Sequence, residues 1–232
     1  MRIVFNHLTI GLIYRDGARL IPAFAGTIIS FFYQLINLYG SLPAGFLVVI
    51  FLAMVSTIFS YTLHLFSLFF IPLPICAIIT LTILAASFIA WLFINIRINR
   101  TAKLKIFKLN YSSRLAFNGL AVLLCNQALT INISPETRFW DVHFKPGLAG
   151  NLKPYDPEIL NKLIQEDFIQ IQQVLGHDAA LFGCTPGSIA KYLGHLPLDN
   201  YTFQVLKTLI PLEHAKIFGL VRDFYFHVIN LQ

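Results

Sequence analysis

The sequence from Gly45 to Ile96 reads GFLVVIFLAMVSTIFSYTLHLFSLFFIPLPICAIITLTILAASFIAWLFINI. It lies inside a longer tract, between Arg19 and Arg97, that contains no Asp, Glu, Lys or Arg, and in which His64 is the only histidine. One membrane-spanning helix needs about 20 apolar residues, whereas a helix at the surface of a soluble protein keeps a polar face. The tract therefore predicts two or three helices in a membrane.

Two clusters of Gly and Pro, at residues 39–45 and 72–74, divide this tract, because such clusters interrupt helices. The predicted helices cover residues 20–39, 45–68 and 74–96. The first contains Ser30, Gln34 and Asn37, so it could span the membrane, lie in the interface or re-enter. Hydropathy favours three spans, and the distribution of positive charge favours two.

The flanks of the tract are basic. Residues 1–19 predict an N-terminal segment at the membrane interface. Residues 97–135 predict a basic juxtamembrane helix followed by an apolar connector. The predicted contacts with anionic headgroups, each contributing about 1 kcal/mol, are Arg97, Arg100, Lys103, Lys105, Lys108 and Arg114. These six bases predict that the C-terminal region faces the cytoplasm.

Residues 136–232 have the composition of a soluble domain, and we expect it to be helical. Asp156, Pro157 and Glu158 are typical of a helix start, apolar residues follow at a spacing of three and four, and Gly176 ends the pattern. Further helices are expected after Thr185-Pro186 and from about residues 199 and 212. The predicted fold is therefore an all-α membrane protein, with two to three transmembrane helices followed by a small helical cytoplasmic domain.

A short segment, Gly183-Cys184-Thr185-Pro186 with Ala190 and Gly194-His195, resembles the first-helix signature of an ankyrin repeat. The resemblance implies a helical repeat unit. It occurs once, whereas ankyrin arrays need about three repeats, and a helix that begins at Thr-Pro and ends at Gly has the same letters. No family is identified over the full chain.

The candidate polar residues are few. His64 is a titratable group in a predicted span. Asp141 and His143 would share one face only if their segment is extended. His177 and His195, together with Cys184, suggest a zinc site or a thiol nucleophile, but the ligand spacings of zinc sites are absent from the sequence. We therefore predict no catalytic residue, no metal and no cofactor.

The leading hypothesis is a membrane protein that anchors a small cytoplasmic interaction module at the membrane surface and is not an enzyme. Its expected partners are a bilayer with anionic headgroups and either a protein or further copies of the chain. The alternatives are an oligomeric channel or transporter component, with Ser30, Gln34 and Asn37 facing the lumen, and a membrane-bound lipid-modifying enzyme that uses Asp141 and His143. Nucleic acid is not an expected partner, because the basic residues adjoin a predicted span.

Overall fold

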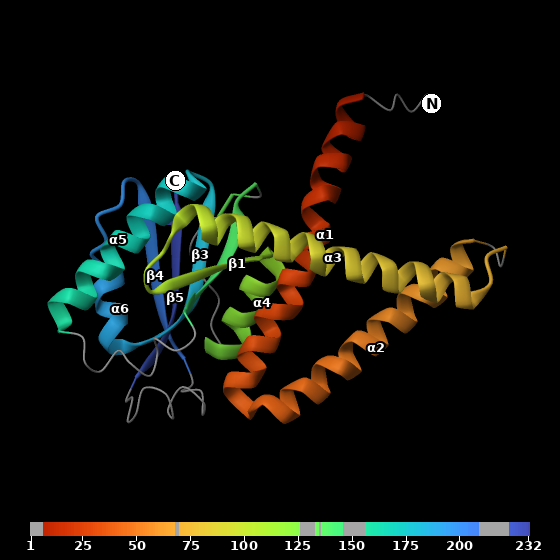
Figure 1. Ribbon diagram of the computed structural model, residues 1–232, viewed down its shortest axis with the longest axis horizontal. Helices are drawn as coiled ribbons and strands as arrows, with labels where there is room; N and C mark the ends of the chain where they lie inside the picture. Colours follow the sequence, from red (N-terminus) through yellow and green to blue (C-terminus); the bar gives the residue numbers. More distant parts are fainter. Residues whose placement is uncertain (1–6, 68–69, 126–132, 135, 146–155, 209–222) are drawn as a thin grey trace.

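The protein contains a five-stranded sheet between two layers of helices, and a long helical hairpin projects from one side (Figure 1). The computed structural model describes residues 7–67, 70–125, 133–134, 136–145, 156–208 and 223–232. The sheet order is β1-β2-β3-β5-β4. β2 and β3 run parallel, and the other neighbours run antiparallel. The strands are β1 (Phe107–Ser112), β2 (Arg138–Phe144), β3 (Ala179–Pro186), β4 (Tyr201–Thr208) and β5 (Phe224–Leu231).

The predicted all-α fold is wrong, because the chain is 63% helical and 21% strand. The error is clearest in the C-terminal region, where helices were predicted from about residues 199 and 212. β4 begins at Tyr201, residues 209–222 lie outside the described part, and the last eight-residue element is β5. β5 is covered on both faces, with seven of its eight residues buried. A strand buried on both faces shows a continuous apolar run instead of alternation, so its periodicity does not distinguish it from a helix.

One face of the sheet is covered by α5 (Pro157–Leu175) and α6 (Gly187–Leu193). The predicted start and end of α5 are confirmed, since the Asp156 side chain accepts a hydrogen bond from the Glu158 N–H and the helix ends at Gly176 with φ of 68°. Thr185-Pro186 ends a central strand before α6 begins, so the segment that resembles an ankyrin signature is a β3–α6 junction in a mixed sheet.

The other face is covered by α1 (His7–Tyr39) and α4 (Arg114–Cys125). α1 runs without interruption through residues predicted to form an interfacial segment and a separate first span; residues 1–6 lie outside the described part. It packs so closely on β1 that a Cβ atom at Gly26 would lie 2.2 Å from the Tyr111 carbonyl oxygen. The first apolar helix is therefore a layer of the α/β domain.

The helical hairpin consists of α2 (Ser41–Phe66) and α3 (Leu73–Ala102). Both helices are long and apolar enough to cross a membrane, judged by length and composition. Large apolar side chains cover their outer surfaces, and only small fractions of their apolar segments are buried. The two helices meet through small side chains, where the Ser60 hydroxyl donates to the Thr80 hydroxyl at 3.3 Å.

α3 continues past the hairpin and lies along the edge strand β1 (Figure 1). Trp91, Asn95 and Asn99 follow one another every four residues, so they lie on one face of the helix. The Trp91 indole donates to the Tyr111 carbonyl at 2.8 Å, and the Asn95 side chain accepts from the Tyr111 N–H at 2.6 Å. The Asn99 amide bonds both the N–H and the carbonyl of Leu109, at 2.9 and 2.7 Å. Side chains of the hairpin thus take the place of a neighbouring strand.

The segment just before β1 is held by a carboxylate. Asp167 of α5 is buried and accepts hydrogen bonds from the backbone N–H groups of Lys105, Ile106 and Phe107, at 2.6, 2.8 and 2.9 Å. The six bases that were predicted to lie along one juxtamembrane helix are distributed over α3, β1, α4 and the connection between α3 and β1, which contains Lys105. Arg97 and Arg100 lie on α3, Lys103 ends that helix with φ of 47°, Lys108 lies in β1 and Arg114 begins α4. All six side chains are exposed.

Candidate functional site

A group of polar side chains lies between α1 and the sheet, on the face opposite α5. We call this group the polar cluster; it consists of Gln34, Asn110, Asp141, His143 and Cys184. Asn110 of β1 and Asp141 of β2 are directly opposite each other in the antiparallel register. Cys184 comes from β3, and the Gln34 amide nitrogen of α1 lies 4.0 Å from its sulfur. The five residues of the polar cluster thus come from four elements, α1, β1, β2 and β3.

Asp141 and His143 form the centre of the polar cluster. The Asp141 Oδ2 lies 2.8 Å from the His143 Nε2, and the side chains are 1% and 13% exposed. The ring of Tyr33 on α1 packs on the imidazole, with centroids 4.4 Å apart. The carboxylate contact meets the distance of an ion pair without the alignment of a hydrogen bond, because neither Asp141 oxygen has a hydrogen-bond partner among the described residues.

The polar cluster contains more free acceptors than donors. The buried Gln34 Oε1 and Asn110 Oδ1 atoms, like both Asp141 oxygens, lack a hydrogen-bond partner within the described part of the chain. Buried oxygens without partners are costly, so such a group favours a species that supplies N–H or O–H donors or a positive charge. The cluster can also hold an imidazole beside a carboxylate, which is the arrangement that orients a histidine for proton transfer.

The thiol of Cys184 is unsuited to nucleophilic chemistry. Burial raises the pKa of this thiol well above its ordinary value, and the Asp141 carboxylate and Cys125 raise it further. Because the thiolate is the nucleophile, the environment disfavours the reactive form. The two histidines that were considered together with this thiol lie elsewhere. The His177 Nδ1 lies 2.5 Å from the Gln232 carbonyl, and His195 is exposed beyond the end of α6.

His64 contacts the backbone at the turn of the hairpin. Its Nδ1 lies 2.6 Å from the Ile71 carbonyl, between the end of α2 and the start of α3. Two of the three polar residues that the pore hypothesis placed at a lumen are buried against the sheet instead, and the side chain of the third, Asn37, lies outside the described part. The Ser30 hydroxyl bonds the Ser112 hydroxyl at 2.9 Å, and Gln34 belongs to the polar cluster. No three His, Cys, Asp or Glu side chains among the described residues are grouped as metal ligands.

A residue that sequence patterns did not single out is His227. It lies in the middle of β5, 1% exposed, opposite Gly183 of β3. A Cβ at Gly183 would be 3.1 Å from the imidazole, so a glycine makes room for the ring. Burial, and to a smaller extent the charge of His143, lower the pKa of His227 to about 3. A histidine buried in a run of Phe, Val and Ile could have been found only from the pairing of β3 with β5.

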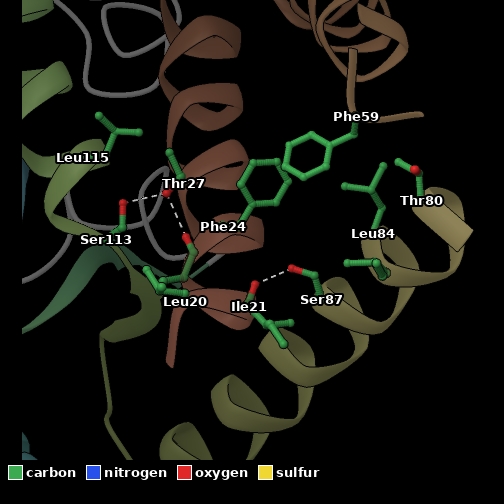
Figure 2. Close-up of a pocket in the computed structure, with 12 residues that line it drawn as sticks. Leu20, Ile21, Phe24, Thr27, Phe59, Thr80, Leu84, Ser87, Ser113 and Leu115 are labelled. Carbon is green, nitrogen blue, oxygen red and sulfur yellow. Dashed lines mark hydrogen bonds between the residues drawn. The ribbon is translucent and has the colours of Figure 1, made fainter. Parts of the chain in front are cut away.

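A second feature is an apolar cavity of about 370 Å³ bounded by α1, α2 and α3 (Figure 2). Leu20 and Phe24 of α1, Phe59 of α2 and Leu84 of α3 project into it, and Leu115 at the start of α4 lies at its side. It lies on the side of α1 that faces the hairpin.

No protein-family model, curated protein or solved structure matches this chain.

Proposed function

We propose that this protein is a membrane-anchored α/β module, in which the helical hairpin lies in the bilayer and the sheet domain lies at the membrane surface. The observation that supports it is the outer surface of the hairpin. Large apolar side chains are exposed along both helices, among them Phe46, Met54, Ile58, Ile78 and Phe93. Surfaces of this size and composition are found on monomers mainly where they meet a membrane or another protein, and both helices have the length to span a bilayer.

Two further observations favour contact between the domain and the bilayer surface. Four exposed bases, Arg97, Arg100, Lys103 and Lys108, follow the apolar part of α3 and have no ion-pair partner among the described residues. Each would contribute about 1 kcal/mol near anionic lipids. Lys105 is engaged differently, because it pairs with Glu166 at 2.6 Å.

Helix α4 supports the same orientation of the domain. Its inner face packs on the sheet, whereas Leu115, Val122 and Leu123 are exposed on its outer face. A helix with one apolar outer face and one face on the domain core is suited to the interface between headgroups and acyl chains. We infer that α4 lies in that interface.

Insertion of the hairpin is tested by fluorescence quenching in vesicles that contain brominated phospholipid. The variants are Met54→Trp, in the middle of α2, and Ile159→Trp, on α5 at the far face of the domain. Both side chains are exposed to a similar degree, 57% and 52%, so the pair is matched. We expect quenching of the added fluorescence in Met54→Trp and none in Ile159→Trp. Equal quenching of the two variants, or none in either, would overturn the proposal.

The cytoplasmic position of the sheet domain is part of this proposal. The bases at the end of α3 should retain that end in the cytoplasm, and the domain follows it. A reporter fused after Gln232 should therefore be active only on the cytoplasmic side. Activity on the opposite side would reverse the orientation while leaving the hairpin inserted.

A second candidate is a membrane-bound enzyme that modifies lipids. The contact between Asp141 and His143 favours it, because a carboxylate beside an imidazole can orient a general base. Phospholipid vesicles containing the protein would be analysed by mass spectrometry for changed lipids, with His143→Ala as the control variant. A product that forms with the wild type and not with His143→Ala would support this candidate, and unchanged lipids would exclude the phospholipids tested.

A further inference from the structure

We propose that the apolar cavity between α1, α2 and α3 binds one acyl chain of a membrane lipid. This inference rests on the proposed insertion of the hairpin. The cavity of about 370 Å³ is walled mainly by Leu, Ile, Phe and Ala side chains. Its lining covers Leu20–Thr27 of α1 and Thr80–Ser87 of α3, or roughly 10 Å of each helix at about 1.5 Å per residue. Those dimensions suit a segment of a single chain.

The hydroxyl groups in the lining use their protons within the protein and have none to donate to a polar ligand. The hydroxyl groups at the cavity belong to Thr27, Thr80, Ser87 and Ser113. Thr80 donates to the Cys76 carbonyl at 2.9 Å, and Ser87 donates to the Ile21 carbonyl. Thr27 and Ser113 bond each other at 2.6 Å (Figure 2). Each hydroxyl proton thus has an acceptor within the protein, and the rest of the lining is apolar, which favours an apolar occupant.

Water is a poor occupant of this cavity. One buried water needs about 10–15 Å³ and two or more polar partners, so the cavity has room for several waters but offers them few polar partners. The cavity is open to its surroundings, since Leu20, Phe59 and Leu115 in its lining are each more than 60% exposed. A cavity of this size among apolar helices is therefore filled by apolar atoms, and inside a bilayer those atoms belong to lipids.

The hydrogen bonds at the two ends of the cavity maintain its shape. Ser87 joins α3 to α1 at one end, and the pair Thr27–Ser113 joins α1 to the β1–α4 connection at the other (Figure 2). α2 contributes Phe59, which faces Phe24 across the opening (Figure 2). Because α1 is also bound to the sheet, the hairpin cannot simply close onto α1 without breaking these contacts. The cavity is therefore a preformed site, as ligand sites generally are.

The experiment detects a lipid that stays bound after the bilayer is removed. The protein is reconstituted in vesicles of phosphatidylcholine that carries a photoreactive group at the end of one acyl chain, extracted into mild detergent, and then illuminated. We expect attachment of about one lipid per chain, at residues 20–27 of α1 or 80–87 of α3. Absence of attached lipid in the extracted wild type would overturn the inference.

Matched variants test the location of the chain. Leu84→Trp fills the cavity from α3, and Leu20→Trp fills it from α1; both should lower the attached lipid by about ten-fold. Leu81→Trp makes the same change on α3 at a side chain that is exposed and outside the lining, and it should retain the lipid. Thermal unfolding of all three verifies that each variant folds, and either of the two filling variants suffices. Equal retention in a folded filling variant and in Leu81→Trp would also overturn the inference.

The quenching of Met54→Trp separates this inference from the proposed function. If the hairpin inserts and the extracted protein retains no lipid, the acyl-chain site is wrong and the membrane anchor stands. If Met54→Trp is not quenched, the membrane anchor itself is wrong.

Discussion

Asp167 and Asp141 are both withdrawn from solvent, at 2% and 0% exposure, but their surroundings differ. Asp167 accepts three backbone N–H groups where the chain enters β1. The Asp141 carboxylate contacts the His143 imidazole, and it accepts no aligned hydrogen bond from the described residues. Three donors around a carboxylate make it part of the scaffold. A carboxylate that lacks them retains the capacity to bind something else, which is why the polar cluster is the candidate site and Asp167 is not.

The largest effect expected from this comparison is the loss of Asp167. Asp167→Ala leaves three N–H groups without their acceptor, and hydrogen bonds to charged groups contribute about 1.5–3 kcal/mol each. We expect the free energy of unfolding to fall by roughly 4 kcal/mol or more, measured by chemical denaturation in detergent micelles. Glu166→Gln is the control, because its pair with Lys105 is exposed and screened by solvent, so that its loss should change stability little. Similar losses in the free energy of unfolding in the two variants would contradict the structural role assigned to Asp167.

The same comparison extends to two asparagines. Both amide atoms of Asn99 bond the backbone of Leu109, whereas the Asn110 Oδ1 has no partner in the described part of the chain. Asn99→Leu should therefore lower the free energy of unfolding by about 2 kcal/mol, and Asn110→Leu by about half as much. Denaturation under identical conditions compares them. An equal or larger loss in Asn110→Leu would mean that Asn110 is also fully bonded.

The buried imidazole of His227 predicts a pH dependence of stability. Its pKa in the folded state is about 3, below the ordinary value of 6.5. Between those values the unfolded chain binds a proton and the folded chain does not, so stability falls as the pH is lowered from about 6.5. At pH 5 the loss relative to pH 7 should be about 2 kcal/mol. His227→Gln should lack this part of the pH dependence, and an unchanged profile in that variant would contradict the buried neutral histidine.

The smallest effect is expected at Asp141 itself. Asp141→Asn keeps the shape of the side chain and removes a buried charge that has only one partner, so the free energy of unfolding should change by less than about 1 kcal/mol in either direction. Denaturation of Asp141→Asn beside Asp167→Asn compares the two carboxylates directly. A loss of more than about 2 kcal/mol in Asp141→Asn would place Asp141 with the scaffold groups.

The parts of the fold that the sequence predicted are those determined locally. The hairpin was predicted from its uncharged tract, and α5 from its cap residues and apolar spacing. The sheet was missed because β3 and β5 are buried on both faces and acquire their identity from partners far along the chain. α1 was placed in the membrane on its composition, although Ser30 and Gln34 bond groups of the sheet domain.

The candidate site was predicted in part. Asp141 and His143 were expected to share a face if their segment is extended, and β2 meets that condition. Cys184 was considered with His177 and His195, whereas the register of β2 and β3 and the packing of α1 place it with Asp141 and Gln34. Neither Gln34 nor Asn110 carries a local signal, because each contributes only through a tertiary contact.

The packing of α1 on the sheet also has a consequence for biosynthesis. α1 is made before the sheet, and its contacts with Ser112 and Cys184 involve residues that are made much later. At about 5–20 residues per second, the interval between completion of α1 and synthesis of β3 is on the order of ten seconds. During that time the polar face of α1, with Ser30 and Gln34, lacks the strands that cover it in the finished protein. α1 is thus made well before its final neighbours, and during synthesis its polar face needs a temporary environment.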